Sequence, residues 1–443
     1  MKKPSRICII GGGSYNWSPT LLRDLALTPG IAGTVVIHDL HAGAAHDMCL
    51  LGRKIARATA APLEFEANPS LTESLDGADF VVLTITTGGL EATQLDLEIP
   101  RAHGIVQSVG DTVGPGGLAR ALRNIPVALE IAQTMERVCP DAWLLNLTNP
   151  MTTLVRAVTK RTSIKTVGLC HEVFGTRRVL SRLFAETGDA LDVQVAGINH
   201  LIWLLDARIG GRDALDLLRC HLDGGGAIPL KPVREPHLEP FQDRWTLKLA
   251  LFARYGALPA AGDRHLAEFF PYFLDEASRH GAAWDVRLTT IEHRRAMGEA
   301  ARARTRAWID GSAEIPLERS EEEVADIIAA VANGKTHRAV VNLPNKGQVA
   351  NLPHDAVVET LGTIGPAGAH GIGVGDLPPG VLTTVLPHVL NQELIVDAAL
   401  TGDRTLALQA LLADPLTRHF QTAPIMLDEL MHAHAAYLPQ FSV

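Results

Sequence analysis

The chain has 443 residues, of which 47% are hydrophobic and 20% charged, and a formal net charge of −9. One hydrophobic core rarely supports a chain of this length, so we expect two closely packed domains. Phosphate binding depends on clustered Lys and Arg, and no such cluster occurs here, so the acidic balance argues against nucleic acid as a partner.

The chain shows no sign of membrane insertion or export. No apolar run reaches the roughly 18 residues of a membrane span, and the amino terminus leads into a strand pattern instead of a signal-peptide core. The cysteines are odd in number and spread far apart: Cys8, Cys49, Cys139, Cys170 and Cys220. This does not suggest a disulfide framework. We therefore expect a cytoplasmic protein with reduced thiols and no membrane partner.

The first pattern along the chain is strand, glycine turn and helix. Residues 6–10 form an apolar run of strand length, and a turn follows at once with Gly11, Gly12, Gly13 and Ser14. Ser18 can then cap a helix, and Pro19 suits its first turn. Such a turn lets backbone N–H groups approach a pyrophosphate, so we expect these four residues to bind a dinucleotide. Asn16 replaces the third glycine of the usual fingerprint, so a purely structural turn remains the alternative.

The next strand, over residues 34–39, ends in Asp39. An acidic residue at this position receives a ribose hydroxyl, and it favours NAD because a carboxylate repels the 2′-phosphate of NADP. The alternative for Asp39 is a helix cap. The alternation continues with helices expected at 41–59 and 70–76 and strands at 63–67 and 79–86. This order predicts an α/β fold with an N-terminal Rossmann-like, doubly wound parallel sheet that binds its ligand across the strand ends.

A glycine- and charge-rich stretch follows the strand at 79–86. We expect a long loop from Gly88 through residue 126, of the kind that covers an active site, and then a helix to about residue 137.

Polar residues lie near the ends of the neighbouring strands. We expect Thr84 and Asn146, the latter within a strand at 142–148, to contact the cofactor. Asn149 precedes Pro150 and a helix with apolar spacing typical of one buried face. Asn149 is therefore expected to be the cap of that helix, a substrate contact, or both.

Cys170 and His200 each end a strand-like apolar run. A thiolate and an imidazole could converge there on one divalent cation. The alternatives are that Cys170 is a buried small hydrophobic residue and that His200 is a hydrogen-bonded histidine of the core.

Past His200 the alternation becomes less regular. The pattern predicts a loop at 222–240, a strand, turn and strand at 338–353, and helices at 243–255, 266–280, 293–310, 320–332 and 389–413. We therefore expect an NAD-binding domain over 1–196 and a mixed α/β domain over 197–443. The second domain should carry substrate contacts and the subunit contacts of a homodimer or homotetramer.

These motifs together resemble glycoside hydrolase family 4, the NAD- and manganese-dependent glycosidases. The likeness spans nearly the whole chain and rests on Ile-Gly-Gly-Gly-Ser at 10–14, the Gly-Pro-Gly-Gly loop at 114–117 with Ala-Leu-Arg at 121–123, Asn-Leu-Thr-Asn-Pro at 146–150, Cys-His-Glu-Val at 170–173, Gly-x-Asn-His at 197–200 and Asn-x-Pro-Asn-x-Gly at 342–347.

The resemblance implies that Cys170 and His200 bind Mn²⁺. It also implies an elimination mechanism outside the usual scheme of two carboxylates. NAD⁺ takes a hydride from C3 of the sugar, the metal polarises the C2 and C3 oxygens, and a protein base removes the C2 proton. The leaving group departs from C1, water adds, and the hydride returns, so that the net reaction is hydrolysis of a small glycoside.

The resemblance also suggests which residues act on the sugar. The segment that supplies a tyrosine base in phospho-sugar relatives reads Gly-Asp-Arg-His here, so Asp263 is the expected C2 base, with Tyr255 and Tyr272 as substitutes. His171 is expected to protonate the leaving group or to contact the sugar. We expect substrate contacts from Asn149, Asn199 and Arg264, although Arg264 could instead pair with Glu268.

The Cys-His-Glu-Val motif departs from the versions that accompany 6-phosphosugars, so an unphosphorylated hexoside is expected. An α-glucoside comes first, with an α-galactoside or a hexuronoside behind it. Two other classes share the sheet: an NAD-dependent dehydrogenase of the lactate or malate type, and an NAD-binding sensor without catalysis. Neither needs the pair of Cys170 and His200, and the chain is long for such a dehydrogenase.

Overall fold

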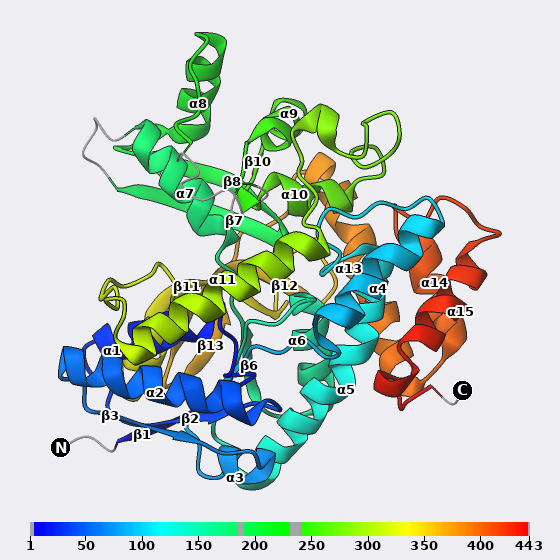
Figure 1. The fold of residues 1–443 in the computed structure, drawn as a ribbon. Coiled ribbons are helices and arrows are strands. Elements are labelled where there is room, and N and C mark those ends of the chain that lie inside the picture. Colours follow the sequence, from blue (N-terminus) through cyan, green and yellow to red (C-terminus); the bar gives the residue numbers. More distant parts are fainter. Residues whose placement is uncertain (1–3, 185–189, 231–238, 240, 442–443) are drawn as a thin grey trace.

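A computed structural model describes residues 4–184, 190–230, 239 and 241–441. One 13-stranded sheet runs through the molecule, with helices on both faces (Figure 1). Its main strands lie in the order β10-β8-β7-β12-β11-β6-β5-β4-β1-β2-β3.

The amino-terminal half of this sheet is parallel. Its strands are β1 (Ser5–Ile10), β2 (Gly33–His38), β3 (Leu63–Ala67), β4 (Phe80–Leu83), β5 (Trp143–Asn146) and β6 (Lys165–Gly168). The connecting helices are α1 (Ser18–Leu27), α2 (Ala42–Thr59), α3 (Leu71–Leu75), α4 (Gly89–Ala102), α5 (Gly114–Val138) and α6 (Met151–Arg161). The order β3-β2-β1-β4-β5-β6 is that of a Rossmann fold, which confirms the expected doubly wound sheet.

The sheet continues as an antiparallel half with β7 (Leu191–Ile198), β8 (Leu201–Ile209), β9 (Arg212–Asp213), β10 (Leu258–Pro259), β11 (His337–Pro344), β12 (Val357–Gly365) and β13 (Gly368–Gly371). Strand β11 joins the two halves by pairing with β6. Because one sheet crosses residue 196, the division into domains at that position stays a prediction.

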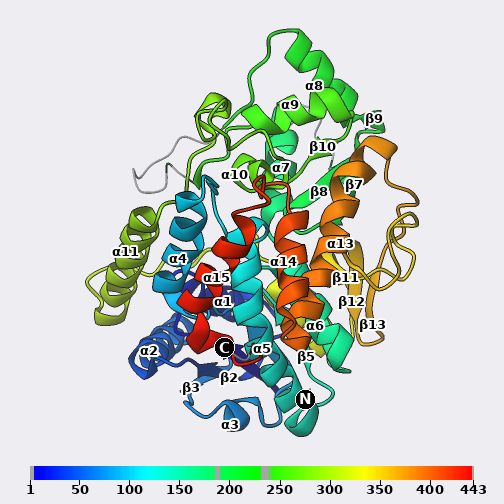
Figure 2. The ribbon, with the colours of Figure 1, turned by 90° about the vertical axis from the view of Figure 1, so that its right-hand side faces the viewer.

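The remaining helices pack on the antiparallel half of the sheet and against the helices of the parallel half. They are α7 (Glu172–Leu183), α8 (Ala214–Asp223), α9 (Thr246–Tyr255), α10 (Asp263–Leu266), α11 (Ile291–Asp310), α12 (Val324–Ala332), α13 (Pro379–Thr401), α14 (Arg404–Ala413) and α15 (Ala423–Ala433). Figure 2 shows α13, α14 and α15 beside α4, α5 and α6. Among the described residues, no helix combines the length and the apolar character needed to cross a membrane.

Alternating side chains of the parallel strands fill two separate cores. In β1, Ile7 and Ile9 pack with α1, α2 and α12, whereas Cys8 and Ile10 pack with α5, α6 and the carboxyl-terminal helices. Strands buried on both faces read as continuous apolar runs, which is why the sequence predicts them well. The expected strand at 63–67 and the helices at 41–59, 70–76, 243–255, 293–310 and 320–332 are confirmed to within a few residues.

The expected loop from Gly88 to residue 126 is wrong. Helix α4 occupies Gly89–Ala102 and α5 begins at Gly114, so only residues 103–113 connect them. Gly88, with a φ of 83°, is the N-cap residue of α4, and Pro100 lies in the last turn of that helix. Both residue types are frequent in loops, and here both stand near helix ends.

Two expected helices are also corrected. Over 266–280 only the end of α10 and a short 3-10 turn (Ala267–Phe269) are helical, because Phe270 precedes Pro271 and adopts an extended ψ of 141°. The helix expected at 389–413 is two helices, since Gly402 ends α13 with a φ of 70° and Asp403 caps α14.

The first strand expected within 338–353 is confirmed as β11, but the second is not there. The amide of Asn345 donates to the carbonyl oxygens of Val349 at 2.9 Å and Leu352 at 3.0 Å, which folds this segment into a loop. The partner strand β12 begins at Val357. The loop expected over 222–240 lies partly outside the described residues.

Candidate active site

The glycine turn between β1 and α1 passes too close to its neighbours for side chains. Gly11 has a φ of 77°, and a Cβ there would lie 2.0 Å from the carbonyl oxygen of Thr84. A Cβ on Gly12 would lie 2.7 Å from Cγ2 of Ile37. The N–H groups of both glycines donate to the His38 carbonyl oxygen at 3.0 Å. The turn thus sits where β1, β2 and β4 end, which is where this strand order places a dinucleotide.

Asp39 follows β2 and supports the same turn. Its Oδ2 accepts from the Gly13 N–H at 2.9 Å, and its Oδ1 accepts from the His41 N–H at 2.8 Å. His41, and not Asp39, is the N-cap residue of α2. Ser14 Oγ accepts from the N–H of Trp17, the N-cap residue of α1, at 3.3 Å. A carboxylate can accept about four hydrogen bonds, so Asp39 keeps lone pairs for a ribose hydroxyl. The turn and this carboxylate fit NAD.

The two other expected cofactor contacts lie at neighbouring strand ends. The Thr84 N–H donates to the Ile10 carbonyl oxygen at 2.9 Å. The Asn146 side chain exchanges hydrogen bonds with the Thr148 backbone at 3.0 and 3.1 Å, and Thr148 Oγ1 accepts from the Ile85 N–H at 2.9 Å. The Asn146 amide therefore shapes the strand ends, and its contact with a cofactor stays a prediction.

Cys170 lies after β6, where the chain turns into α7. Burial raises the pKa of its thiol well above the ordinary value, and the carboxylates of Glu359 and Glu172 raise it further. The backbone N–H of Glu172 and the side chain of Asn199 act in the opposite direction, so the sulfur lies beside the residue that precedes His200. A thiolate at this place needs a positive partner such as a cation.

His200 stands with Asn199 in the tight turn between β7 and β8. Its ring is buried, and its φ of 66° is uncommon for a residue other than glycine. Gly197 permits the hairpin, because a Cβ there would lie 2.2 Å from the Leu201 carbonyl oxygen. A strained backbone conformation of this kind is typical of positions that aim a functional side chain.

The loop before α5 brings a carboxylate to His200. Thr112 Oγ1 lies 2.7 Å from Oδ1 of Asp111 and 2.8 Å from Nδ1 of His200. Because a carboxylate only accepts, the hydroxyl donates to Asp111 and accepts from the Nδ1–H of His200. The Nε2 atom of His200 therefore keeps its lone pair.

A second imidazole, that of His265 in α10, stacks on His200 with the ring centroids 3.8 Å apart. Its Nδ1 is 3.9 Å from Oδ1 of Asp111, and its Nε2 is 3.9 Å from Oε1 of Glu172. The buried Nδ1 has no hydrogen-bond partner in the described part of the chain. Burial lowers the pKa of His265 well below its ordinary value, and His200 lowers it further, so the ring is neutral and offers a lone pair.

The two carboxylates beside these rings remain ionised. Burial by itself raises the pKa of Asp111, but nearby positive charge brings it below the ordinary value: His265 and His200 when they are protonated, and Arg120 and Arg294 at every pH. For Glu172, burial is likewise outweighed by His265 and His171 when they are protonated and by Arg264, so the pKa of this carboxyl is also lowered. Glu172 Oε2 accepts from the Gly262 N–H at 2.6 Å, which ties α7 to α10.

Asp111, His200 and His265 form a cluster whose ligand atoms all lie within 4.8 Å of one another. Nitrogen and oxygen donors of this kind suit Mn²⁺, so the residues fit the cation. Cys170 is not part of the cluster. The sequence singles out neither Asp111, which lies in a glycine-rich segment, nor His265, which follows the expected base; only their convergence in space identifies them.

Asn149 connects α5 with Asp111. Its carbonyl oxygen accepts from Nε of Arg120 at 3.1 Å and from Nδ2 of Asn124 at 3.0 Å. Its own Nδ2 lies 3.5 Å from Oδ2 of Asp111, and its buried Oδ1 has no hydrogen-bond partner among the described residues. Pro150, and not Asn149, is the N-cap residue of α6. The Asn149 amide is therefore free to contact a substrate, which remains a prediction.

Two further arginines approach the cluster from α10 and α11. The Arg264 guanidinium lies over the Phe241 ring at 4.7 Å and donates to Thr289 Oγ1 at 3.3 Å. Arg294 donates to the Val109 carbonyl oxygen at 2.8 Å, and its buried Nε lacks a partner within the described ranges. The site thus combines ionised carboxylates with positive groups that have donors to spare.

Glu268 does not pair with Arg264, which settles the alternative left open for these two side chains. Its Oε1 accepts from the backbone N–H groups of Val109 and Gly110 at 2.8 Å each. Burial raises its pKa to about 8, so this carboxyl is protonated at neutral pH. Glu268 therefore holds the loop that carries Asp111.

Asp263, the expected base, lies two residues before His265 in the chain and holds the start of α9. Its Oδ2 accepts from the Leu247 N–H at 3.1 Å, and its Oδ1 accepts from the Lys248 N–H at 2.9 Å. Burial raises the pKa of Asp263 to about 7, and the neighbouring Asp243 contributes in the same direction. To take a proton from a sugar, the carboxylate must release one of its contacts with α9.

The tyrosines named as substitutes for this base lie against each other at the edge of α9. Tyr255 packs on Trp203 with ring centroids 5.3 Å apart. Burial raises the pKa of Tyr272 to about 12, and the hydrogen bond with Tyr255 adds to the shift. A phenol with so high a pKa is a weaker candidate for a base near neutral pH.

His171 lies at the rim of the site, with 47% of its side chain exposed. Its ring centroid is 5.5 Å from that of Trp17, and Nδ1 and Nε2 lie 3.5 Å and 3.7 Å from the carboxylates of Glu322 and Glu172. An exposed imidazole between two carboxylates can pass protons to solvent. Its role toward a leaving group stays a prediction.

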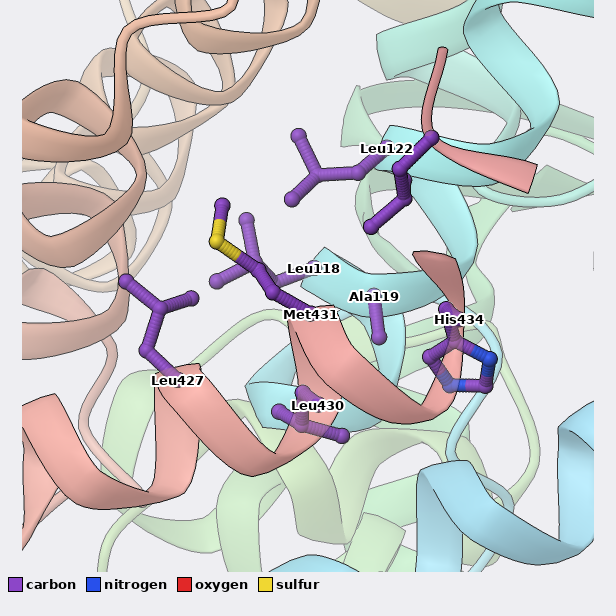
Figure 3. A pocket seen from close by; sticks show the side chains of 8 residues that line it. Leu118, Ala119, Leu122, Leu427, Leu430, Met431 and His434 are labelled. Carbon is purple, nitrogen blue, oxygen red and sulfur yellow. The ribbon is translucent and has the colours of Figure 1, made fainter. Parts of the chain in front are cut away.

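The gap drawn in Figure 3 is not part of this site. It lies between α5 and α15, and its lining is apolar except for one histidine: Leu118, Ala119, Leu122, Leu427, Leu430, Met431, His434 and Leu438. His434 lies 2.9 Å from Asp96, which also pairs with Arg123. Such a lining suits helix packing and offers a sugar few hydrogen bonds.

Known proteins resemble the chain over nearly its whole length. The descriptions of Family 4 glycosyl hydrolase and of its C-terminal domain match residues 6–186 and 195–417. The α-galacturonidase of Lachnoclostridium phytofermentans is 35% identical, covering 98% of this chain and 97% of that protein. The lplD structure from Bacillus subtilis has a TM-score of 0.88 at 36% identity, covering 96% of this chain and 99% of its own.

A more distant structure shares the fold. A 6-phospho-α-glucosidase from gut microorganisms, in complex with NAD and Mn²⁺, has a TM-score of 0.85 at 21% identity, covering 99% of this chain and 100% of its own. The matches to the two family descriptions span both halves of the sheet and include every segment that forms the site. The chain therefore belongs to family 4 of the glycosyl hydrolases.

Proposed function

We propose that the protein is an NAD- and manganese-dependent α-glycosidase that hydrolyses an unphosphorylated hexuronoside, with an α-galacturonide as its expected substrate. Membership of the family supports the glycosidase activity. The relative named α-galacturonidase supports the choice of sugar. This substrate replaces the α-glucoside that the sequence alone places first. The family descriptions do not favour the dehydrogenase alternative.

The main support for a hexuronoside substrate is the positive charge of the arginines around the site. Arg120 and Arg294 lie close enough to Asp111 to lower its pKa, and Arg264 acts in the same way on Glu172. A hexuronoside brings a carboxylate at C6 that a guanidinium can bind through two hydrogen bonds, whereas a glucoside or galactoside brings none.

Arg264 is our candidate for the group that binds the C6 carboxylate. Its side chain is only partly buried, and Nη1 is its one nitrogen with a hydrogen bond in the described part of the chain. The Phe241 ring beneath the guanidinium fixes its plane. The free donors of Arg264 can therefore meet an anionic group without breaking a buried ion pair.

The remaining site residues hold the cofactors and the sugar. When bound, NAD⁺ would take a hydride from C3 and Mn²⁺ would polarise the C2 and C3 oxygens. We assign dinucleotide binding to the glycine turn, Ser14, Asp39, Thr84 and Asn146, and cation binding to His200 and Cys170. Asn149 and Asn199 are assigned to the sugar hydroxyls.

Proton transfer is assigned to two side chains. Asp263 removes the C2 proton, which is supported by its position in the segment that also carries Arg264 and His265. His171 delivers a proton to the leaving group, which is supported by its exposure at the rim of the site. Both residues hold or move a proton and take no part in cofactor binding.

A panel of nitrophenyl glycosides tests the proposal. With NAD⁺, Mn²⁺ and a reductant, we expect release of nitrophenol from the α-galacturonide and much less from the α-glucoside and α-galactoside. Arg264→Gln should raise KM for the uronide more than it changes kcat, while Arg254→Gln on the outer side of α9 serves as the control. Equal rates on charged and neutral sugars would contradict the substrate class, and cleavage without NAD⁺ and Mn²⁺ would contradict the mechanism.

We also propose that the protein is a cytoplasmic homodimer or homotetramer. The five cysteines are all free thiols, which fits a reducing compartment. Leu390, Phe420 and Ile425 are large apolar side chains that lie exposed on the carboxyl-terminal helices and the loop between them. Light scattering of the purified protein should give two or four times the chain mass, and a monomer would refute the assembly.

A further inference from the structure

We propose that Asp111 and His265 are direct ligands of the divalent cation, together with His200. This inference rests on the proposed use of Mn²⁺ and adds two residues to the pair that the sequence motifs indicate. It concerns the cation site in the absence of sugar. The three ligands come from the α4–α5 loop, the β7–β8 turn and α10.

The spacing of the three side chains supports a shared cation. Their ligand atoms lie within 4.8 Å of one another, so a single ion can reach all of them with small adjustments. Each segment is held in place independently. Glu268 anchors the loop of Asp111 through two N–H groups, and Gly197 allows the turn of His200.

The hydrogen bonds leave the required lone pairs free. Thr112 accepts from Nδ1 of His200, so Nε2 of that ring is available. Nδ1 of His265 is buried, lacks a hydrogen-bond partner among the described residues and lies 3.9 Å from Oδ1 of Asp111. A buried polar atom without a partner is costly, and a cation between these groups would remove that cost.

The charges in the cluster are also suitable. Two imidazoles stacked 3.8 Å apart cannot both become protonated without strong repulsion, whereas a single cation can bind both rings. Asp111 adds one negative charge that partly neutralises the ion. Cys170, the remaining candidate, lies outside this cluster and can serve as a further ligand only after losing its proton.

Manganese binding to the full-length protein, without NAD⁺ or sugar, tests the assignment. Free Mn²⁺ is measured by its paramagnetic resonance signal during titration. The loss of a group that only orients a metal ligand costs about 10–100-fold in affinity, so Asp111→Asn and His265→Gln should each weaken binding by at least about 100-fold. Glu268→Gln and His388→Gln are the matched controls, a buried carboxyl and a buried histidine outside the cluster, and should bind nearly as the wild type does.

A gain of signal provides a second readout. In His265→Cys, a thiolate at a ligand position should add a sulfur-to-metal charge-transfer band when Co²⁺ replaces Mn²⁺. Thermal unfolding without metal shows whether each variant is folded, and a variant that is not folded leaves the decision to the others. Wild-type affinity in both Asp111→Asn and His265→Gln, or no new band in a folded His265→Cys, would overturn the assignment.

The titration also separates this inference from the function on which it rests. If the wild type does not bind Mn²⁺, the proposed cofactor is wrong. If the wild type binds and only one of the two ligand variants is weakened, the assignment of the other residue fails. None of these outcomes depends on which sugar the enzyme cleaves.

Discussion

The glycine turn and the cation cluster lie in the same molecule but are built in opposite ways. The turn uses consecutive residues between β1 and α1, and its hydrogen-bond partners His38 and Asp39 lie at the end of the adjacent parallel strand β2. The cluster takes Asp111, His200 and His265 from segments far apart in the chain. One site is a property of a local motif, and the other exists only after the antiparallel half of the sheet has joined the parallel half.

This difference decides how each site should respond to mutation. In the turn, the backbone is expected to contact the ligand. Glycine is needed there because a side chain, as at Gly11, would collide with neighbouring atoms. In the cluster, side chains make the contacts, and the buried groups around them fix their orientation. Changes in the cluster should therefore alter chemistry with little effect on folding, because the hydrophobic cores lie elsewhere.

The largest effect is expected from His200→Ala, which removes the central side chain of the cluster. We expect turnover to fall by more than about 100-fold, since even groups that only orient metal ligands contribute up to that much. The variant should unfold at nearly the wild-type temperature without Mn²⁺, as judged by circular dichroism. Cys170→Ser tests the thiol in the same way, and full activity in saturating Mn²⁺ would remove that residue from the ligands.

The second effect tests the proton transfer beside the cluster. Asp263→Asn keeps the volume and removes the basicity, so turnover should fall by roughly 10²-fold or more, the scale of a general base. NAD⁺ binding should persist because the side chain of Asp263 accepts from α9 and its N–H donates to Asp243, so that neither group holds the glycine turn in place. In D₂O, the wild type should place deuterium at C2 of the released sugar, as measured by proton NMR.

Two results would change the assignment of this base. If Asp263→Asn turned over normally while Tyr255→Phe or Tyr272→Phe did not, the base would be a tyrosine. Full protium at C2 would instead speak against exchange of that proton. Because Asp263 also accepts two N–H groups of α9, its unfolding temperature must be recorded, and a large drop would assign the residue to folding.

The same contrast explains what could be predicted from the sequence. Strands β1 to β6 and the glycine turn follow from continuous apolar runs and local turn chemistry, and the structure confirms them. The sequence also selects His200, because the family resemblance fixes its motif. Local sequence patterns fail in two places. At α4, glycine and proline near the helix ends suggest a loop. Asp111 and His265 come together only in the folded chain and have no signal within their own segments.

A smaller effect, on cofactor choice, tests the local site. Asp39 receives two backbone N–H groups and is expected to repel a 2′-phosphate, so NAD⁺ should bind at least about tenfold more tightly than NADP⁺, a difference of about 1.4 kcal/mol. Asp39→Asn keeps an acceptor for the Gly13 N–H but loses the charge, and should narrow the preference. Fluorescence titration measures both affinities, and equal binding of the two cofactors by the wild type would reject this role for Asp39.

The smallest effect concerns Glu268, which supports the cluster without belonging to it. Burial raises its pKa from 4.5 to about 8, so the folded protein holds one more proton than the unfolded chain between these values. Stability from this group is therefore complete below pH 4.5 and is lost as the pH rises through about 8.

Glu268→Gln resembles the protonated form and does not titrate. The wild type should therefore lose unfolding temperature relative to Glu268→Gln between pH 4.5 and about 8, and above that range the difference between the two proteins should stay constant. Glu268→Ala is the control that leaves the N–H groups of Val109 and Gly110 without an acceptor, at a cost of about 1–3 kcal/mol each at every pH. A difference between Glu268→Gln and the wild type that does not change with pH would mean that Glu268 is ionised in the folded protein.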